Sequence, residues 1–322
     1  MIRGINLNVF SRGYLGFDRS HAQLDAMKAA GVTWVAVVPN WYMPTKESNQ
    51  IRRHHDTPTD ASLRTFIREA HERGIRVLLK PHVDVETGDW RGEITPANDA
   101  AWFNNYKRMI TGYARLAQQE GVEALVIGVE FNTMQDRTLR WRQVISAVRR
   151  AYDGQITYAA NWNGYDGVQF WDDLDWIGID AYFPLAGGNR NPRVAGMTQR
   201  LRGHLDAVED WRTQQGHPVS RKPVVITEVG YTSVDGGSQS PSHYPDSCAE
   251  PGVVVDMNEQ RDAYTALFRA ISERPWLAGV FLWWWDNPST SDHYPHGDDW
   301  ECFYTPRGKP AMRVIINAYR RP

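Results

Sequence analysis

The 322-residue sequence contains only two cysteines, Cys248 and Cys302, and no apolar run near the roughly 20 residues that a membrane-spanning helix needs. Two cysteines cannot form a disulfide framework, so the fold must depend on packing. The N-terminal segment MIRGINLNVF begins an apparent strand without a charged and then apolar leader. We therefore expect either a cytoplasmic protein or a secreted one whose leader is absent from this chain.

The chain also lacks a charge excess, because 36 basic side chains balance 38 acidic ones to a net charge of −2. This balance argues against nucleic acid or an anionic membrane as the partner. No G-x-G-x-x-G or P-loop follows the first strand, and the G-x-S-x-G and H-E-x-x-H signatures are missing. These absences disfavour nucleotide binding, serine-nucleophile chemistry and zinc-peptidase chemistry. We expect no cofactor and no catalytic metal, and the oligomeric state is left open.

Aromatic residues, in contrast, are abundant, with 14 tryptophans and 14 tyrosines. Several of the tryptophans fall in loop-like segments, among them Trp41, Trp90 and Trp162. Large flat side chains near a surface suit ligands that have apolar ring faces, although the same rings can simply cover a core. The pattern favours a small or neutral ligand without identifying it.

Helix and strand patterns alternate along the chain. Three segments, 21–39, 63–81 and 113–130, each contain an amphipathic helix, a glycine in the place of a left-handed C-cap, and a β-rich run. Eight apolar runs can be counted, at 4–8, 33–39, 75–82, 123–129, 156–160, 175–180, 223–228 and 279–285. Helical patterns lie near 20–30, 60–73, 99–119, 137–151, 196–214, 257–273 and 309–319, with room only for a short helix around 167–173.

Eight such units in one chain of this length predict an α/β protein with a closed (β/α)₈ TIM barrel rather than an open Rossmann-like sheet. No linker, charge block or low-complexity segment divides the sequence, so residues 1–322 are expected to form a single catalytic domain. The irregular stretch 232–256 is too long for an ordinary connection. We expect it to be an extended loop over the C-terminal face of the barrel.

Two glutamates end buried strands. Glu130 closes the run EALVIGVEFN and Glu228 closes PVVITEVGYT. A single glutamate in this place is commonly a solvated loop residue, but two of them, on the fourth and seventh strands, would share the mouth where barrel enzymes have their active sites. Paired carboxylates can divide glycoside hydrolysis between a proton donor and a nucleophile, and a separation of about 5–5.5 Å would give retention.

Polar residues at other strand ends are candidates for supporting roles. Tyr182 is placed to hydrogen-bond the nucleophile. Asp180 faces either the mouth or the barrel interior, with a structural ion pair to an arginine as the alternative. Lys80, His82 and Asp84 alternate and so share one face of an extended segment. We expect these three to contact sugar hydroxyls, since two ligands without a third make a metal site at His82 and Asp84 a weak hypothesis.

The run of three tryptophans on the eighth strand must divide between two sides, because alternate residues of a strand point in opposite directions. We expect Trp283 and Trp285 to face the site and Trp284 to pack outward against helices. Trp41 and Trp90 are further candidates for sugar-stacking platforms, with core burial as the alternative.

Five segments resemble glycoside hydrolase family 113: GVEFN (128–132), ITEVGY (226–231), KPHVDVETGDWRGEI (80–94), LWWWDNP (282–288) and TPRGKPA (305–311). The resemblance runs from the first strand to the last helix, and the segment 80–94 is its most specific part. It implies a retaining barrel glycosidase, chiefly β-mannanase-like, in which Glu130 is the general acid/base and Glu228 the nucleophile.

One departure from the wider clan is Val129, which stands where many members have an asparagine that contacts the sugar 2-hydroxyl. We expect Asn161 or Asn163 to replace that contact. The residues expected to bind substrate are Asn8, Trp41, Lys80, His82, Asp84, Trp90, Asn161, Trp162, Asn163, Asp180, Trp283 and Trp285.

The sequence thus predicts a retaining hydrolase of β-1,4-linked mannan or manno-oligosaccharides. Two alternatives stay open: the same machinery acting on xylan or another β-glycan, and a non-catalytic carbohydrate-binding barrel. Cys248 and Cys302 fall on the loops after the seventh and eighth strands, which are neighbours in a closed barrel. A disulfide between them and a pair of free thiols are equally compatible with this placement.

Overall fold

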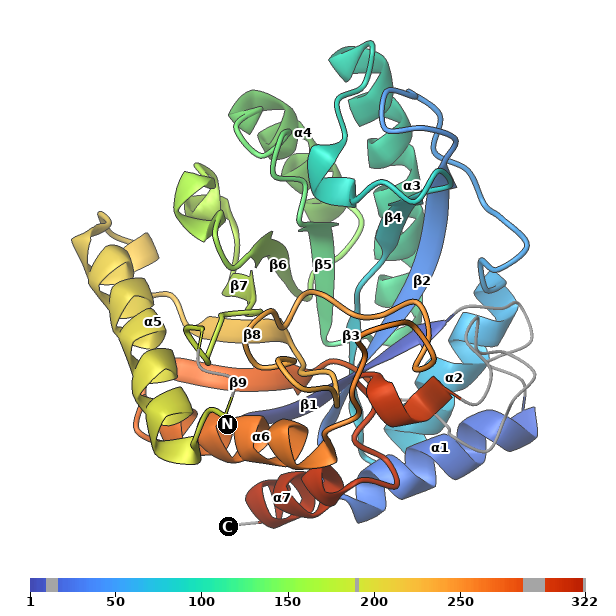
Figure 1. The fold of residues 1–322 in the computed structure, drawn as a ribbon. Coiled ribbons are helices and arrows are strands. Elements are labelled where there is room, and N and C mark those ends of the chain that lie inside the picture. The colour runs from blue at the N-terminus through green and yellow to red at the C-terminus, as the bar shows by residue number, and fades with distance from the viewer. Residues whose placement is uncertain (10–16, 189–190, 286–298, 321–322) are drawn as a thin grey trace.

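The computed structural model describes residues 1–9, 17–188, 191–285 and 299–320, and its centre is a closed parallel barrel (Figure 1). Its strands are β1 (Ile2–Val9), β2 (Trp34–Met43), β3 (Arg76–Leu79), β4 (His82–Val85), β5 (Ala124–Val129), β6 (Gln155–Asn161), β7 (Ile177–Asp180), β8 (Val224–Val229) and β9 (Leu277–Leu282). The hydrogen-bonded order is β1-β9-β8-β7-β6-β5-β3-β2-β4, and the pairing of β1 with β2 closes the ring. All pairings are parallel, so the predicted (β/α)₈ barrel is confirmed.

Seven α-helices of the described chain surround the barrel: α1 (Phe17–Ala29), α2 (Asp60–Glu72), α3 (Asp99–Glu120), α4 (Thr138–Arg149), α5 (Val194–Gln214), α6 (Met257–Ile271) and α7 (Pro310–Tyr319). They lie around the outside of the strands in Figure 1, in the order of the sequence. None of the described helices combines the length and apolar character that crossing a bilayer requires.

The sequence-predicted elements agree with these bounds except in four places. β2 runs on to Met43, beyond the predicted range 33–39. The third predicted strand is two short strands, β3 and β4, with Lys80 and Pro81 between them, and proline supplies no backbone donor there. The last strand ends at Leu282, so the predicted extension through Trp285 was wrong. The short helix predicted around 167–173 is a pair of 3₁₀ turns, Tyr165–Gly167 and Trp171–Asp173.

Local sequence explains where the helices begin and end. Thr59 and Asn98 cap α2 and α3 by accepting from the backbone N–H three residues later, at 3.1 and 3.0 Å. The predicted left-handed glycines follow α1, α2 and α3 with φ values of 90°, 70° and 66° at Gly31, Gly74 and Gly121. A β-carbon disfavours this conformation, so glycine ends each helix.

The barrel interior changes from apolar to polar along its axis. Near the N-terminal ends of the strands, Trp34 packs edge-on against Trp176 and Phe281, with centroids 6.0 and 6.2 Å apart. Gly4 makes room for that layer, because a β-carbon there would lie 2.3 Å from the Phe281 ring. Towards the C-terminal ends the inward positions become asparagine, lysine and carboxylate residues. Alternation along each strand thus directs the polar residues to one mouth of the barrel.

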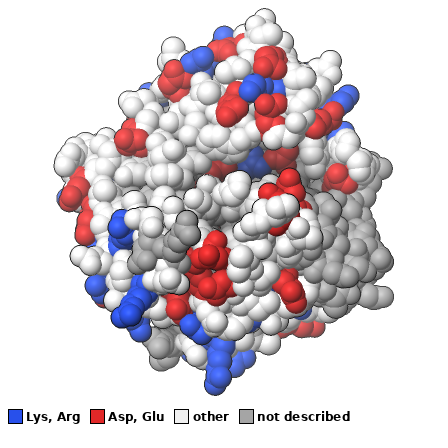
Figure 2. All heavy atoms as spheres, in the orientation of Figure 1, with Lys and Arg blue, Asp and Glu red and all other residues white. Residues whose placement is uncertain are grey.

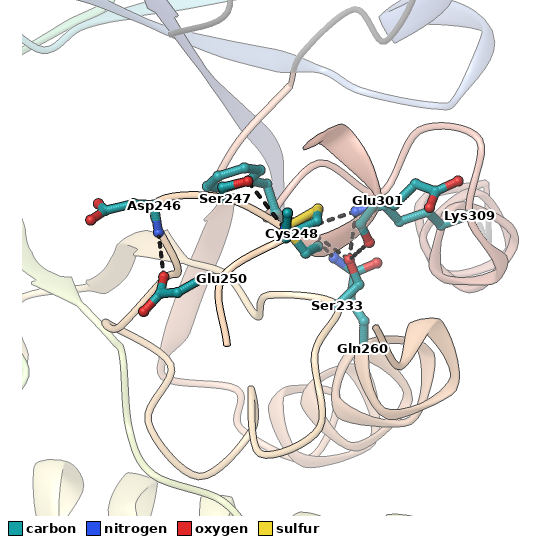
Figure 3. The surroundings of a disulfide bond; sticks show 11 residues. Ser233, Asp246, Ser247, Cys248, Glu250, Gln260, Glu301 and Lys309 are labelled. Atoms are coloured by element: carbon teal, nitrogen blue, oxygen red, sulfur yellow. Dashed lines mark hydrogen bonds between the residues drawn. A yellow bond between two sulfur atoms is a disulfide. The ribbon is translucent and has the colours of Figure 1, made fainter. Parts of the chain in front are cut away.

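The long segment between β8 and α6 lies over this mouth and is fastened by a disulfide between Cys248 and Cys302 (Figure 3). Around the bond, Ser233 Oγ donates to the carbonyl oxygen of Glu301 at 2.6 Å, and Lys309 Nζ donates to Ser233 Oγ at 2.7 Å. The structure therefore joins the two cysteines that the sequence left open, and the segment predicted to be a functional loop is tied to the chain that follows β9.

Loss of this disulfide is expected to lower the free energy of unfolding by about 2–4 kcal/mol, because the bond closes a loop between residues 54 positions apart in sequence. The double variant Cys248→Ser/Cys302→Ser should unfold at lower urea concentration than the wild-type protein, and wild-type protein with dithiothreitol should behave like the variant. Equal midpoints, together with two titratable thiols in the unfolded, unreduced wild-type chain, would contradict the bond.

Candidate active site

A cavity of about 700 Å³ opens at the C-terminal ends of the barrel strands. Both strand-end glutamates, Glu130 and Glu228, line it, together with other residues that the sequence singled out: Asn8, Asp84, Trp90, Asn161, Trp162, Asn163, Tyr182 and Trp283. Figure 2 shows this face hollowed near its centre, with basic and acidic atoms at the edge of the hollow. The volume lies in the usual range for small-molecule sites.

Glu228 lies at the end of β8 and is 3 % exposed. Its Oε1 accepts a charged hydrogen bond from Lys80 Nζ and lies 3.5 Å from His82 Nε2, while its Oε2 accepts from the Tyr182 hydroxyl at 2.7 Å. Both oxygens are thereby held by side chains that are themselves buried. This carboxylate has one fixed orientation at the floor of the cavity.

The contacts of Glu228 keep it ionised. Burial alone would raise the pKa of this carboxyl, but the positive charge of Lys80 and the contact with His82 oppose burial, and the pKa is lowered to about 2. Tyr182 contributes a neutral donor, since burial and the charge of Glu228 raise the pKa of its phenol well above its ordinary value. Glu228 is thus an anion across the neutral pH range.

His82 is neutral in this setting. Burial, followed by the charge of Arg91, lowers the pKa of its imidazole to about 4. Its ring is stacked over Trp283, with centroids 6.0 Å apart and planes 7° apart. The sequence predicted that His82 contacts a sugar. In the structure His82 does not line the cavity and lies instead against Glu228.

Lys80 and Asp180 lie below Glu228 and are fully buried. Lys80 Nζ donates to Asp180 Oδ1 at 3.0 Å, and the same oxygen accepts from Thr227 Oγ1 at 2.7 Å. Burial and the nearby charge of Glu228 raise the pKa of Asp180 well above its usual range. Lys80 is therefore the charge partner of Glu228, and neither Lys80 nor Asp180 lines the cavity as the sequence interpretation expected.

Glu130, directly after β5, has a left-handed backbone with φ of 51°. Such a conformation costs a non-glycine residue about 1 kcal/mol, and it directs the chain out of the strand at the cavity. Glu130 Oε1 accepts from Asn161 Nδ2 at 2.9 Å, and Oε2 lies 3.4 Å from Trp90 Nε1 and 3.5 Å from Arg91 Nη1. Its two oxygens therefore have separate partners from different parts of the barrel mouth.

The pKa of Glu130 moves in the opposite direction from that of Glu228. Burial raises it most, and the negative charge of Glu228 raises it further, whereas Arg91 and Lys80 lower it. The pKa values of the two carboxyls in one cavity thus shift in opposite directions, because Lys80 lies directly against Glu228 whereas the nearest cation to Glu130, Arg91, is 3.5 Å away. That difference is what a proton donor and a nucleophile need.

Arg91 is a site residue that the sequence interpretation missed. Its guanidinium forms an ion pair with Asp84 and reaches Glu130 Oε2 at 3.5 Å, and its side chain is only 15 % exposed. The segment 80–94 carries the family resemblance, but β4 ends at Val85 and a turn separates it from Arg91. Strand alternation therefore gave no signal for Arg91.

Two predicted stacking residues lie outside the cavity. Trp41 packs beside α3, where its Nε1 donates to the Tyr113 hydroxyl at 2.7 Å and Arg53 covers its ring at 5.0 Å. Trp285 is 2 % exposed and donates from Nε1 to Gln23 Oε1 at 2.7 Å. Neither residue lines the site.

The cavity is also lined by four aromatic residues that the sequence analysis did not place there: Trp284, Tyr244, Phe303 and Tyr304. Trp284 was expected to pack outward, but β9 ends two residues before it, so strand alternation no longer applies there. Tyr304 is held by a hydrogen bond from its hydroxyl to the Pro241 carbonyl at 2.6 Å. These four come from the long loops, whose placement no periodic pattern in the sequence predicts.

A parallel (β/α)₈ barrel defines the class of glycoside hydrolases when its C-terminal mouth has aromatic walls and two glutamates whose pKa values shift in opposite directions. The family model of Glycoside Hydrolase Family 113 matches residues 8–306, and the chain belongs to that family. The resemblance seen in the sequence is thereby confirmed. Of the motif 282–288, residues 286–288 lie outside the described residues.

Solved structures agree with this assignment. One described as a complex structure of a family 113 β-1,4-mannanase is 27 % identical, with a TM-score of 0.85, over 100 % of this chain and 99 % of that one. The family 113 β-mannanase of Alicyclobacillus acidocaldarius, solved in complex with ManMIm, is 28 % identical with a TM-score of 0.83, over 99 % and 96 % of the two chains. A comparison with curated proteins finds no match.

A more distant structure shares the fold. A substituted form of the subfamily GH5_18 enzyme of Streptomyces cattleya, solved in complex with Manβ1-4GlcNAc, is 18 % identical with a TM-score of 0.66, over 99 % of this chain and 80 % of that one. At this identity the likeness concerns the barrel alone.

Proposed function

We propose that this glycoside hydrolase cleaves β-1,4-linked mannan or manno-oligosaccharides with retention of configuration, and that residues 1–322 form one catalytic domain. The observation that carries the proposal is that two glutamates line one cavity with different partners, Lys80 and Tyr182 at Glu228 and Asn161 at Glu130. The pKa is accordingly lowered to about 2 for Glu228 and raised for Glu130. The choice of mannan is supported by two similar structures, which are described as β-1,4-mannanase and β-mannanase.

In the first step Glu228 is the nucleophile. Its carboxylate oxygen forms a bond to the anomeric carbon while the glycosidic C–O bond breaks, and the carboxyl proton of Glu130 passes to the leaving oxygen. The products are a covalent glycosyl ester of Glu228 and a free sugar. Lys80 and Tyr182 hold the attacking carboxylate in place, which removes the need to reorient it during the reaction.

In the second step Glu130, now a carboxylate, takes a proton from water. The water oxygen bonds to the anomeric carbon, the ester bond to Glu228 breaks, and the sugar leaves with its original configuration. Asn161 donates to one oxygen of Glu130, and Arg91 lies near the other. Positive charge near Glu130 favours the anionic form that this step requires.

The aromatic side chains lining the cavity are proposed to stack on sugar rings. Trp90, Trp162, Trp283 and Trp284 present large apolar faces along it, while Asn8, Asp84 and Asn163 supply polar groups for hydroxyls. Asn161 was expected to contact the sugar 2-hydroxyl. Its amide group already donates to Glu130 at 2.9 Å, so we assign it to positioning that carboxyl.

Incubation with mannohexaose tests the proposal directly. We expect shorter manno-oligosaccharides, with the β-anomer formed first in a proton NMR time course. Parallel assays on xylan and cellulose oligosaccharides test the alternative substrates, which the two carboxylates do not discriminate. An initial α-anomer would contradict the retaining mechanism, and turnover of xylohexaose alone would contradict the substrate.

The dependence of kcat/KM on pH should have its two limbs set by the two glutamates. Activity requires Glu228 ionised and Glu130 protonated. We therefore expect the acid limb near the pKa of about 2 for Glu228 and a descending alkaline limb above the ordinary glutamate value, as Glu130 loses its proton. Rates on an activated aryl β-mannoside measure this profile. A Glu130→Gln variant that keeps the same alkaline limb would contradict the assignment.

The substitution Tyr182→Phe should lower kcat/KM by about 10- to 100-fold, the worth of one hydrogen bond to a charged group. It should also move the acid limb to higher pH, because the lost donor stabilised the anionic form of Glu228. Tyr231→Phe is the matched control, since the buried Tyr231 hydroxyl has no hydrogen-bond partner in the described part of the chain. If the two variants have equal pH profiles, Tyr182 does not stabilise the anionic form of Glu228.

A further inference from the structure

A cluster of potential metal ligands lies in the loop between β2 and α2. Its members are His54, His55 and Asp56, and it is the one cluster of three such side chains within the described ranges, with one ligand atom from each residue lying within 4.8 Å of the others. His54 Nδ1 is 3.3 Å from Asp56 Oδ2, and His55 Nε2 is 3.0 Å from Asp56 Oδ1. None of the three lines the cavity described above.

The backbone on both sides of the cluster is anchored to β2. Tyr42 and Arg52 form an antiparallel bridge with two N–H···O bonds of 2.9 Å. On the other side, the buried hydroxyl of Thr57 donates to the Asn40 carbonyl at 2.7 Å and accepts from the His54 N–H at 2.9 Å. The three ligands thus lie in a short turn with two fixed ends, which lowers the ordering cost of bringing them together around an ion.

Nearby positive charges do not oppose a cation. Arg52 is paired with Glu86 at 2.9 Å, and Arg53 is paired with Asp60. Asp56 contributes a carboxylate group to the cluster. The local electrostatics therefore favour a divalent ion.

We propose that His54, His55 and Asp56 bind one divalent transition-metal ion of the Zn²⁺ class. One ligand atom from each of the three residues already lies within 4.8 Å of the others, and small side-chain rotations bring these atoms to the separation of about 3.3 Å that a tetrahedral zinc with ligand distances of about 2.0–2.1 Å requires. Two imidazole nitrogens select against Mg²⁺ and Ca²⁺, which prefer oxygen ligands. The exposed side chain of His55 leaves the ion accessible, with a fourth position for water.

The site adjoins the proposed active site without belonging to it. The His54 ring packs against Tyr42 with centroids 4.9 Å apart, and Tyr42 is close enough to both Asp56 and Asp84 for their charges to act on its phenol. Asp84 in turn pairs with Arg91 at the cavity. The ion would stabilise the 44–59 turn on the rim of the barrel, and the hydrolysis proposed above does not depend on it.

Calorimetric titration of the metal-free protein, residues 1–322, with ZnCl₂ tests the site. We expect the wild-type protein to bind one more Zn²⁺ ion than His55→Ala or Asp56→Asn, or to bind it at least about tenfold more tightly. Zinc should also raise the thermal midpoint of the wild-type protein more than that of either variant, because it binds only the folded state.

His71→Ala is the matched control, because His71 contacts a single carboxylate, Glu123, at 3.2 Å and lies outside the cluster of three ligands found in the described ranges. Its zinc titration should equal that of the wild-type protein. If His55→Ala and Asp56→Asn bind the same number of ions with unchanged affinity, the proposal is wrong. Mannohexaose turnover by the metal-free variants is measured separately. The absence of zinc binding would therefore not contradict the proposed hydrolysis, and the absence of hydrolysis would not contradict the metal site.

Discussion

Glu228→Gln should reduce kcat on mannohexaose by at least about 10⁴-fold, since the amide oxygen is a far weaker nucleophile than the carboxylate. The side chain keeps its size, so cavity shape and KM should change little. The structural reason for the large effect is that Lys80 and Tyr182 hold a charge that the amide no longer carries. The loss is measured from initial rates, by quantifying the products in samples quenched at successive times.

The charge removed by this substitution also affects its neighbours. Lys80 would then be a fully buried cation whose remaining carboxyl partner is Asp180. The raised pKa of Asp180 should fall once the Glu228 charge is gone, which favours the carboxylate form of Asp180 as the partner of Lys80. We therefore expect the variant to fold, which circular dichroism checks.

Glu123→Gln is the matched control for Glu228→Gln. Glu123 lies at the opposite end of the barrel, just before β5, where it accepts from the Val77 N–H at 2.8 Å. Its loss should leave kcat unchanged within a factor of about two. Turnover by Glu228→Gln within tenfold of the wild-type rate would exclude Glu228 as nucleophile, whatever the control shows.

Glu130→Gln should lower kcat/KM on mannohexaose by about 10²- to 10⁴-fold, the usual contribution of a general acid. An aryl mannoside with a 2,4-dinitrophenolate leaving group needs no proton in the first step, so its glycosylation rate should stay near that of the wild-type protein. The second step still needs a base. We therefore expect a burst of dinitrophenol followed by slow turnover, measured by stopped-flow absorbance.

Azide distinguishes this role from general damage to the site. A small anion that needs no deprotonation should restore turnover of the aryl substrate and give β-mannosyl azide, since the glycosyl ester of Glu228 is then attacked directly. The positively charged Arg91 near Glu130 favours entry of an anion. Equal losses on both substrates, with no effect of azide, would contradict the acid/base assignment.

Residues whose function depends on strand ends were predictable from sequence. The apolar runs before Glu130 and Glu228 indicated parallel strands, and the rule that barrel sites lie at the C-terminal ends brought the two together. Tyr182 followed from the same reasoning, and the structure places its hydroxyl 2.7 Å from Glu228. Backbone hydrogen bonding makes such positions regular, so a periodic pattern carries the information.

Residues beyond the strands were not predictable in this way. Trp285 was expected in the site and packs against Gln23, whereas Trp284 was expected outside and lines the cavity. Arg91 and Tyr244 lie on segments whose conformation depends on contacts with other loops. Side-chain direction there is decided by tertiary packing, and no local period encodes it.

The order of helices and strands, the glycines that end three helices, and the two glutamates at strand ends were determined by the sequence alone, because each depends on local backbone geometry and alternation. The tertiary structure decided that Lys80 donates to Glu228, that Cys248 is joined to Cys302, and that the pKa values of the two glutamates shift in opposite directions. These depend on burial and on contacts between residues far apart in the chain. Only closure of the barrel removes the water that would otherwise screen those charges and make the two carboxyls alike.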